Sequence, residues 1–122
     1  MKLGPATPIF RIFDEDRARD FYIRWLGCHV LFEHRFGPDM PLYLAVGRDG
    51  FVLHLSEHSG DTTPGTRIRV AVDDIAALHA DLMSRPEKSL RLGPPQEQSW
   101  GELDLTVTDP FGNRITFYQE QS

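Results

Sequence analysis

Apolar residues recur at two different spacings along this chain, and the change of spacing predicts helices alternating with strands. After Asp14 they recur at helical spacing, at Ala18, Phe21, Tyr22 and Trp25. Asp14 is suited to accept hydrogen bonds from the first helical turn, and Gly27 is suited to end the helix. A second helix is expected after Asp73 or Asp74, ending at Pro86. Its buried face is formed by three apolar residues, Ile75, Leu78 and Leu82.

The remaining apolar segments are typical of strands. Three of them lie at 30–33, 41–46 and 51–55, and turns rich in Gly, Pro and Asp separate them. A further strand in 90–98 is weaker, because Pro94-Pro95 and polar residues interfere with strand pairing. The sequence therefore predicts three antiparallel strands after the first helix and a less regular segment after the second.

The end of the chain has the pattern of a hairpin. Its first arm alternates apolar Leu103, Leu105 and Val107 with polar Asp104, Thr106 and Thr108. The turn is Asp109-Pro110-Phe111-Gly112-Asn113, where proline fixes one backbone angle and the last two residues tolerate the positive φ of a tight reversal. One face of the hairpin is therefore expected to pack, and the other to meet solvent or a ligand.

The chain contains an approximate internal repeat. The strand and helix that begin at 8–14 recur at 67–73, an offset of 59 residues in a chain of 122. We expect one domain over 1–122, made of two β-α-β-β-β modules at about 5–60 and about 65–120. The fold class is α+β.

Composition narrows the range of functions that the chain can have. The chain has 13 Lys and Arg against 18 Asp and Glu, a net charge of −5, which disfavours nucleic-acid binding and favours a cationic small partner. The single Cys28 excludes an internal disulfide. No signal-like segment precedes Pro5 and no apolar run approaches about 18 residues, so a cytoplasmic protein without a membrane partner is expected.

Three groups of residues, in this order and spacing, resemble the glyoxalase/bleomycin-resistance/extradiol-dioxygenase superfamily, also called the vicinal oxygen chelate proteins. They are the opening Phe13-Asp14 … Asp20-Phe21-Tyr22 … Leu26-Gly27, the segment Val72-Asp73-Asp74, and the turn Asp109-Pro110-Phe111-Gly112-Asn113. The resemblance spans essentially the whole chain. It implies two βαβββ modules whose curled mixed sheets surround a cavity, often completed in a homodimer.

The resemblance also implies where a metal would bind. Enzymes of this superfamily hold a divalent ion with His and Glu side chains from four strand positions. These positions fall at about Thr7, His54, Arg67 and Thr116, of which only His54 is a plausible ligand. The fixed charge of Arg67 opposes a cation. We therefore expect no metal, no other cofactor and no catalytic residue.

The segment Ser99-Trp100-Gly101-Glu102 resembles the Trp-Gly element of the bleomycin-resistance proteins. In that family the tryptophan lies by the drug-binding groove of a dimer and stacks on flat heteroaromatic rings, while acidic residues suit a cationic drug tail. The resemblance implies that Trp100 and Glu102 contact a ligand.

Other aromatic residues on strands or strand edges supply further surface for a planar ligand. The candidates are Phe32, Phe36 and Tyr43, although for Phe32, as for Phe117, a place in the core is favoured over the pocket. His54 lies among apolar strand residues. This position fits a hydrogen-bonded interior residue and a polar group at the cavity floor equally well.

The favoured interpretation is a metal-independent, bleomycin-resistance-like protein that sequesters a planar cationic compound at the groove of a homodimer. The first alternative is a metal-dependent glyoxalase-type lyase, isomerase or dioxygenase, in which His54 is joined by Glu57 or Glu102. The second is a ligand-sensing or scaffold domain without catalysis.

Overall fold

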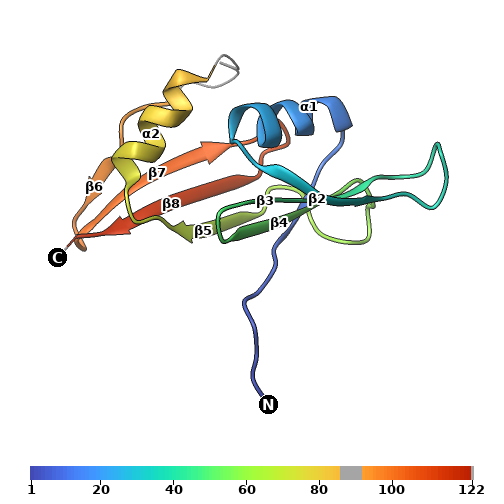
Figure 1. Ribbon diagram of the computed structural model, residues 1–122, viewed down its shortest axis with the longest axis horizontal. Helices are drawn as coiled ribbons and strands as arrows, with labels where there is room; N and C mark the ends of the chain where they lie inside the picture. The colour runs from blue at the N-terminus through green and yellow to red at the C-terminus, as the bar shows by residue number, and fades with distance from the viewer. Residues whose placement is uncertain (86–91, 122) are drawn as a thin grey trace.

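The computed structural model describes residues 1–85 and 92–121, and it contains two four-stranded sheets with a helical segment over each (Figure 1). The first half comprises β1 (Ile9–Arg11), α1 (Glu15–Arg19), the π-helix η1 (Asp20–Trp25), β2 (His29–His34), β3 (Tyr43–Arg48) and β4 (Phe51–Ser56). The second half comprises β5 (Arg67–Ala71), α2 (Ile75–Ser84), β6 (Gln96–Gln98), β7 (Glu102–Thr108) and β8 (Arg114–Glu120).

The two sheets have the same topology. The strand orders are β1-β4-β3-β2 and β5-β8-β7-β6. In each sheet the first strand pairs in parallel with its neighbour, and the remaining pairs are antiparallel. This arrangement confirms the predicted α+β fold class with repeated βαβββ order. The weak strand expected in 90–98 is the short β6, and the expected helix end at Pro86 lies outside the described residues.

Both helices begin at the predicted aspartates. Asp14 accepts a hydrogen bond from the backbone N–H of Arg17 at 3.0 Å, and Asp74 accepts one from Ala77 at 3.0 Å. The first helix continues as the π-helix η1, a widening that apolar spacing does not predict. Gly27 follows it at φ +81°, the left-handed conformation expected of a helix-ending glycine. The four residues predicted to pack from this helix are buried: Ala18, Phe21, Tyr22 and Trp25.

One face of the first sheet carries Leu44, Leu53 and Leu55 and packs toward the core. The opposite face carries Tyr43 and His54, and we call it the open face of this sheet. Alternation along the strands likewise divides the second sheet into a core face and an open face. There, the apolar residues Leu103, Leu105 and Val107 are half-buried or buried and Thr106 and Thr108 are exposed, as the hairpin pattern predicts. Each sheet therefore presents one face that the chain itself leaves open.

Strand β2 contains one extra residue. Val30 pairs with Val46, but Phe32 pairs with Ala45, so Leu31 has no partner of its own. Residues opposite one another on neighbouring strands share a face, and this bulge turns Phe32 to the open face. The core position expected for Phe32 is therefore wrong: its side chain is 49% exposed. The core position expected for Phe117 is confirmed.

The turn at 109–113 joins the two halves of the chain. The buried carboxylate of Asp109 accepts hydrogen bonds from the Tyr22 hydroxyl at 2.6 Å and from the backbone N–H groups of Phe111 and Asn113, both at 2.8 Å. The Asn113 side-chain amide donates both to Asp109 and to the backbone carbonyl of Arg11, each at 2.8 Å. Burial raises the pKa of Tyr22 well above its usual value, and the neighbouring Asp109 charge adds to this effect.

A second junction lies at the other end of η1. Arg48 of β3 donates to the carbonyl of Leu26 at 2.8 Å and pairs with Asp81 of α2 at 3.0 Å. Arg85 also pairs with Asp81, at 3.1 Å. A Cβ atom on Gly27 would lie 2.7 Å from the Arg85 guanidinium, so only glycine fits at this junction without a shift.

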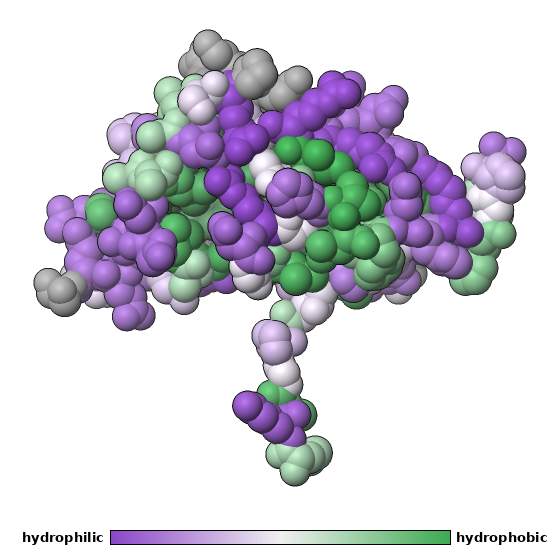
Figure 2. Space-filling view, viewed as in Figure 1, coloured by the Kyte–Doolittle hydropathy of each residue, from purple (hydrophilic) through white to green (hydrophobic). Residues whose placement is uncertain are grey.

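The first residues of the chain extend away from the body (Figures 1 and 2). The segment 1–6 is exposed throughout, including Leu3. Among the described residues, no helix has the length and apolar character needed to span a membrane.

Candidate functional site

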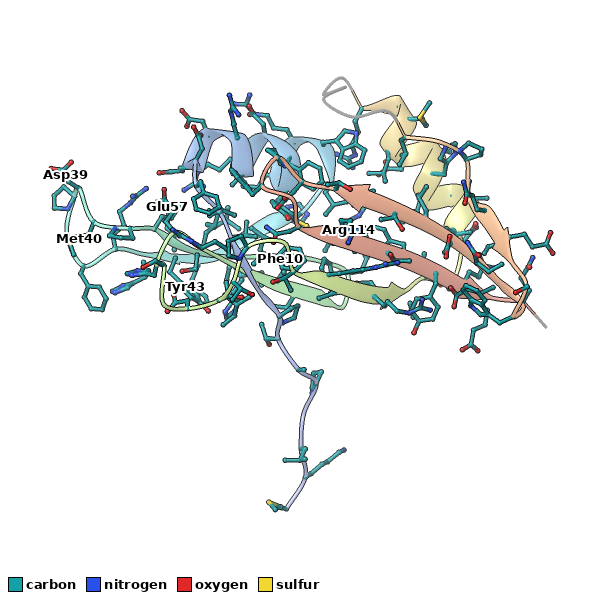
Figure 3. The ribbon with its side chains drawn as sticks, turned by 180° about the vertical axis from the view of Figure 1, so that it is seen from behind. Phe10, Asp39, Met40, Tyr43, Glu57 and Arg114 are labelled. Carbon is teal, nitrogen blue, oxygen red and sulfur yellow. The ribbon has the colours of Figure 1, made fainter. Side chains whose placement is uncertain are left out.

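Four of the six predicted site residues gather at one end of the open face of the first sheet. Figure 3 shows Tyr43 on the side of this sheet away from α1, near the hairpin that carries Asp39 and Met40. The rings of Phe32 and Tyr43 are stacked at 6.3 Å, with an angle of 8° between their planes. The ring of His54 packs edge-on against both, at 5.4 Å from Phe32 and 5.2 Å from Tyr43.

His54 lies on the open face, half-buried, and shares a hydrogen bond of 2.6 Å between its Nδ1 and the Tyr43 hydroxyl. This hydrogen bond fixes the direction of both rings and occupies one of the two imidazole nitrogens. A place for His54 at the floor of a ligand cavity stays a prediction.

A pocket of about 420 Å³ adjoins this cluster, and we call it the hairpin pocket. Its lining residues are Phe32, His34, Phe36, Tyr43, His58 and Asp61. His34, His58 and Asp61 were not predicted as site residues. The only sequence signal was the polar run Ser56-Glu57-His58-Ser59-Gly60-Asp61 directly after a strand, a place where ligand-contacting residues often gather.

The open face of the second sheet is polar. Arg67 donates to the Thr116 hydroxyl at 3.1 Å. Arg69 pairs with Glu102 at 2.5 Å and lies over the ring of Tyr118, with its guanidinium carbon 4.3 Å from the ring centre. Glu102, a predicted ligand contact, is only 5% exposed, and its charge is matched by Arg69. The expected ligand contact of Glu102 stays a prediction.

Trp100 lies in the turn between β6 and β7 and is 65% exposed. This turn and the β2–β3 hairpin are at opposite ends of the molecule (Figure 1). One chain therefore does not bring Trp100 and Glu102 together with the aromatic cluster of Phe32 and Tyr43.

A larger cavity of about 1060 Å³ lies where the base of the N-terminal segment, the β3–β4 turn and β5 meet. Val52, Ile68 and Phe117 contribute apolar surface to it. None of the six residues predicted from the sequence as ligand contacts lines this cavity.

A family model described as "Glyoxalase superfamily protein" matches residues 2–122. The chain belongs to the glyoxalase superfamily. The resemblance inferred from the sequence motifs is thereby confirmed. A search of the curated proteins finds no match.

Solved structures of the glyoxalase superfamily resemble this chain over nearly its whole length. A bleomycin-binding protein complexed with bleomycin is 25% identical, with a TM-score of 0.74 over 98% of this chain and 100% of that one. A glyoxalase/bleomycin resistance protein from Streptomyces sp. CB03234 is 27% identical, with a TM-score of 0.68 over 93% and 100%. TnmS3, an antibiotic binding protein from the same organism, is 25% identical, with a TM-score of 0.69 over 99% and 100%.

The residues at the superfamily's metal positions do not fit a divalent ion in this glyoxalase-like chain. Only His54 among them can ligate a cation, and Arg67 brings a fixed positive charge to the Thr116 hydroxyl. Glu57, the suggested helper, instead accepts a hydrogen bond from the backbone N–H of Leu42 at 2.9 Å. Within 1–85 and 92–121, no group of three or more His, Cys, Asp or Glu side chains is arranged to hold an ion.

Proposed function

We propose that this glyoxalase-superfamily protein binds a planar, cationic small molecule of the antibiotic type and that binding itself is its function. The observation that carries the proposal is the aromatic surface on the open face of the first sheet. Phe32 and Tyr43 expose parallel rings there, beside the exposed Phe36. Aromatic faces exposed together on a strand are suited to stack on a flat ring, at about 1 kcal/mol for each aromatic pair beyond simple burial.

Two of the similar structures support an antibiotic-type ligand. One is described as a bleomycin-binding protein complexed with bleomycin, and another as an antibiotic binding protein. The net charge of −5 supports a cationic rather than an anionic compound. No chemical step is part of the proposal, because the donor set on the open faces suits neither a metal ion nor an activated nucleophile.

The proposed groove needs a second copy of the chain. Within one molecule, the turn that carries Trp100 and the β2–β3 hairpin lie at opposite ends (Figure 1). A twofold axis would bring the open face of the second sheet of one copy toward the open face of the first sheet of the other. The proposed homodimer thus holds two equivalent sites, each with Phe32 from one chain and Trp100 from the partner. We further propose that this dimer acts in the cytoplasm, since its one cysteine is buried and needs no disulfide partner.

The proposal is tested by calorimetric titration of chelator-treated protein with bleomycin, and separately with Zn²⁺, Ni²⁺, Mn²⁺ and Fe²⁺. We expect bleomycin to bind without added metal. Trp100→Ala and Phe32→Ala are each expected to weaken that binding about fivefold, from the loss of one stacking partner. Met83→Ala, which removes an exposed apolar side chain from α2, is the matched control and should leave the affinity unchanged.

The outcomes separate the competing interpretations. Bleomycin binding that neither aromatic substitution weakens would contradict the groove. Stoichiometric metal binding would favour a metal-dependent enzyme instead. Absence of binding to every compound would favour the ligand-sensing or scaffold interpretation.

A further inference from the structure

We infer that the hairpin pocket (Phe32, His34, Phe36, Tyr43, His58 and Asp61) binds an organic ammonium group. The inference deepens the proposed function, on which it rests: it assigns the cationic part of the ligand to this pocket and not to Glu102.

The shape and the ring arrangement of the pocket favour a cation. Five aromatic side chains line a volume of about 420 Å³: Phe32, His34, Phe36, Tyr43 and His58. The Phe36 ring stands nearly perpendicular to those of His34, at 4.7 Å, and His58, at 6.4 Å. With the stacked Phe32 and Tyr43 rings, this forms a partial cage, the arrangement by which proteins recognise quaternary ammonium groups.

Asp61 provides the negative charge of the pocket. Its Oδ2 accepts a hydrogen bond from the Ser56 hydroxyl at 2.6 Å, which fixes the carboxylate at the pocket wall. Among the described residues, no Arg or Lys pairs with Asp61, in contrast to Glu102, whose charge Arg69 matches. Burial raises the pKa of Tyr43, and the charge of Asp61 raises it further. The field of the Asp61 carboxylate therefore reaches the aromatic face on which a cation would lie.

The other charged groups of the surrounding elements are engaged elsewhere. Arg11 of β1 donates to the carbonyls of Ile12 and Ser56 and lies over the Phe13 ring. Arg35, the neighbour of His34, contacts Glu15 on the helix side of the sheet. Glu57 binds the backbone N–H of Leu42, with Arg35 at 3.9 Å. Asp61 is therefore the carboxylate of the described residues that lines the pocket.

The test uses choline and its neutral isostere 3,3-dimethyl-1-butanol as probes of the whole protein. Binding is followed by NMR through the aromatic and backbone signals of the hairpin pocket. At about pH 8 we expect millimolar choline affinity and at least fivefold weaker binding of the alcohol.

Two sets of variants sharpen the result. Asp61→Asn is expected to weaken choline binding about fivefold at pH 8, whereas Asp39→Asn, in the β2–β3 hairpin but outside the pocket lining, is the matched control for a lost negative charge. The double variant His34→Gln with His58→Gln removes two of the lining rings and is expected to weaken choline binding about fivefold as well. This second variant retains the Asp61–Ser56 hydrogen bond, so it tests the pocket even if Asp61→Asn disturbs the loop.

The inference is overturned if choline and the alcohol bind equally, if the shifted signals lie outside the pocket, or if neither Asp61→Asn nor the histidine double variant weakens choline binding. The choline result is independent of the bleomycin titration. Choline binding without bleomycin binding would retain the ammonium site and reject the antibiotic. Bleomycin binding unaffected by Asp61→Asn would retain the proposed function and reject this pocket as the place of its cationic group.

Discussion

Replacement of Asp109 by asparagine tests the junction between the two halves of the chain. Its carboxylate is 4% exposed and accepts four hydrogen bonds, two of them from side chains, Tyr22 and Asn113. An asparagine that keeps its oxygen on the two backbone N–H groups must turn its NH₂ toward the Asn113 amide, another donor. Hydrogen bonds to charged groups contribute about 1.5–3 kcal/mol each, so we expect Asp109→Asn to lower the free energy of unfolding by about 3 kcal/mol.

Tyr22→Phe removes one of these bonds and leaves the others, so a loss of about 1.5 kcal/mol is expected. Both effects are large beside a total stability of about 5–15 kcal/mol for a domain of this size. Urea unfolding followed by tryptophan fluorescence measures them, since Trp25 is 3% exposed in the core. In the double variant we expect the combined loss to be smaller than the sum, because the two side chains share one hydrogen bond.

The raised pKa of Tyr22 adds a pH dependence with a definite sign. A folded pKa above the unfolded value, about 10, means that the folded state holds the proton more tightly, so stability is retained below pH 10 and lost above it. The loss attributable to Tyr22 is about 1.4 kcal/mol per pH unit above pH 10. Burial also raises the pKa of Cys28, to about 11, and this contribution is common to the wild type and Tyr22→Phe.

The stability difference between the wild type and Tyr22→Phe is therefore expected to shrink as the pH rises above about 10. A difference that stays constant across that range would refute the role assigned to the Tyr22 hydroxyl. Equally, a loss below about 1 kcal/mol for Asp109→Asn would show that the carboxylate is not the shared acceptor of this junction.

Other predictions concern the second junction and the ligand. In urea unfolding, Gly27→Ala is expected to lower stability by about 1 kcal/mol more than Gly65→Ala does. Both glycines have positive φ, but only at Gly27 would the added Cβ atom meet a side chain, that of Arg85. Equal losses of stability would contradict this close approach. Burial raises the pKa of Asp81, but hydrogen bonds and charges from Arg48 and Arg85 outweigh the effect of burial, so the pKa is lowered. The contribution of Asp81 to stability should therefore be present above about pH 4 and be lost below that pH. This pH dependence should be missing in Asp81→Asn. Raising the salt concentration should weaken bleomycin binding in calorimetry, and an affinity independent of salt would remove the electrostatic part of the proposal.

Much of the fold could be predicted because local signals and apolar periodicity agree. Asp14 and Asp74 cap their helices as expected, and the strands at 29–34, 43–48 and 51–56 lie within a few residues of the expected bounds. The π-helical widening at 20–25 was not predictable, because residues spaced for an α-helix are also buried when one turn is wider.

The candidate site was less predictable, because it depends on long-range contacts. Phe32, Phe36 and Tyr43 were named from their aromatic character, but sequence alone could not show that they meet His58 and Asp61. Nor could the sequence show that Arg69, on another strand, forms an ion pair with Glu102. Aromatic type and strand position are local properties, whereas convergence on one pocket is a property of the sheet.

The extra residue in β2 has an evolutionary consequence. If Leu31 instead paired with Ala45, so that the strand ran in register from Val30 without the bulge, Phe32 would lie opposite Leu44 and face the core. Loss of the bulge alone would thus remove an aromatic ring from the open face without changing any residue of the proposed site. A superfamily member could gain or lose a ligand-stacking residue through such a step, and comparison of residue types alone would miss the change.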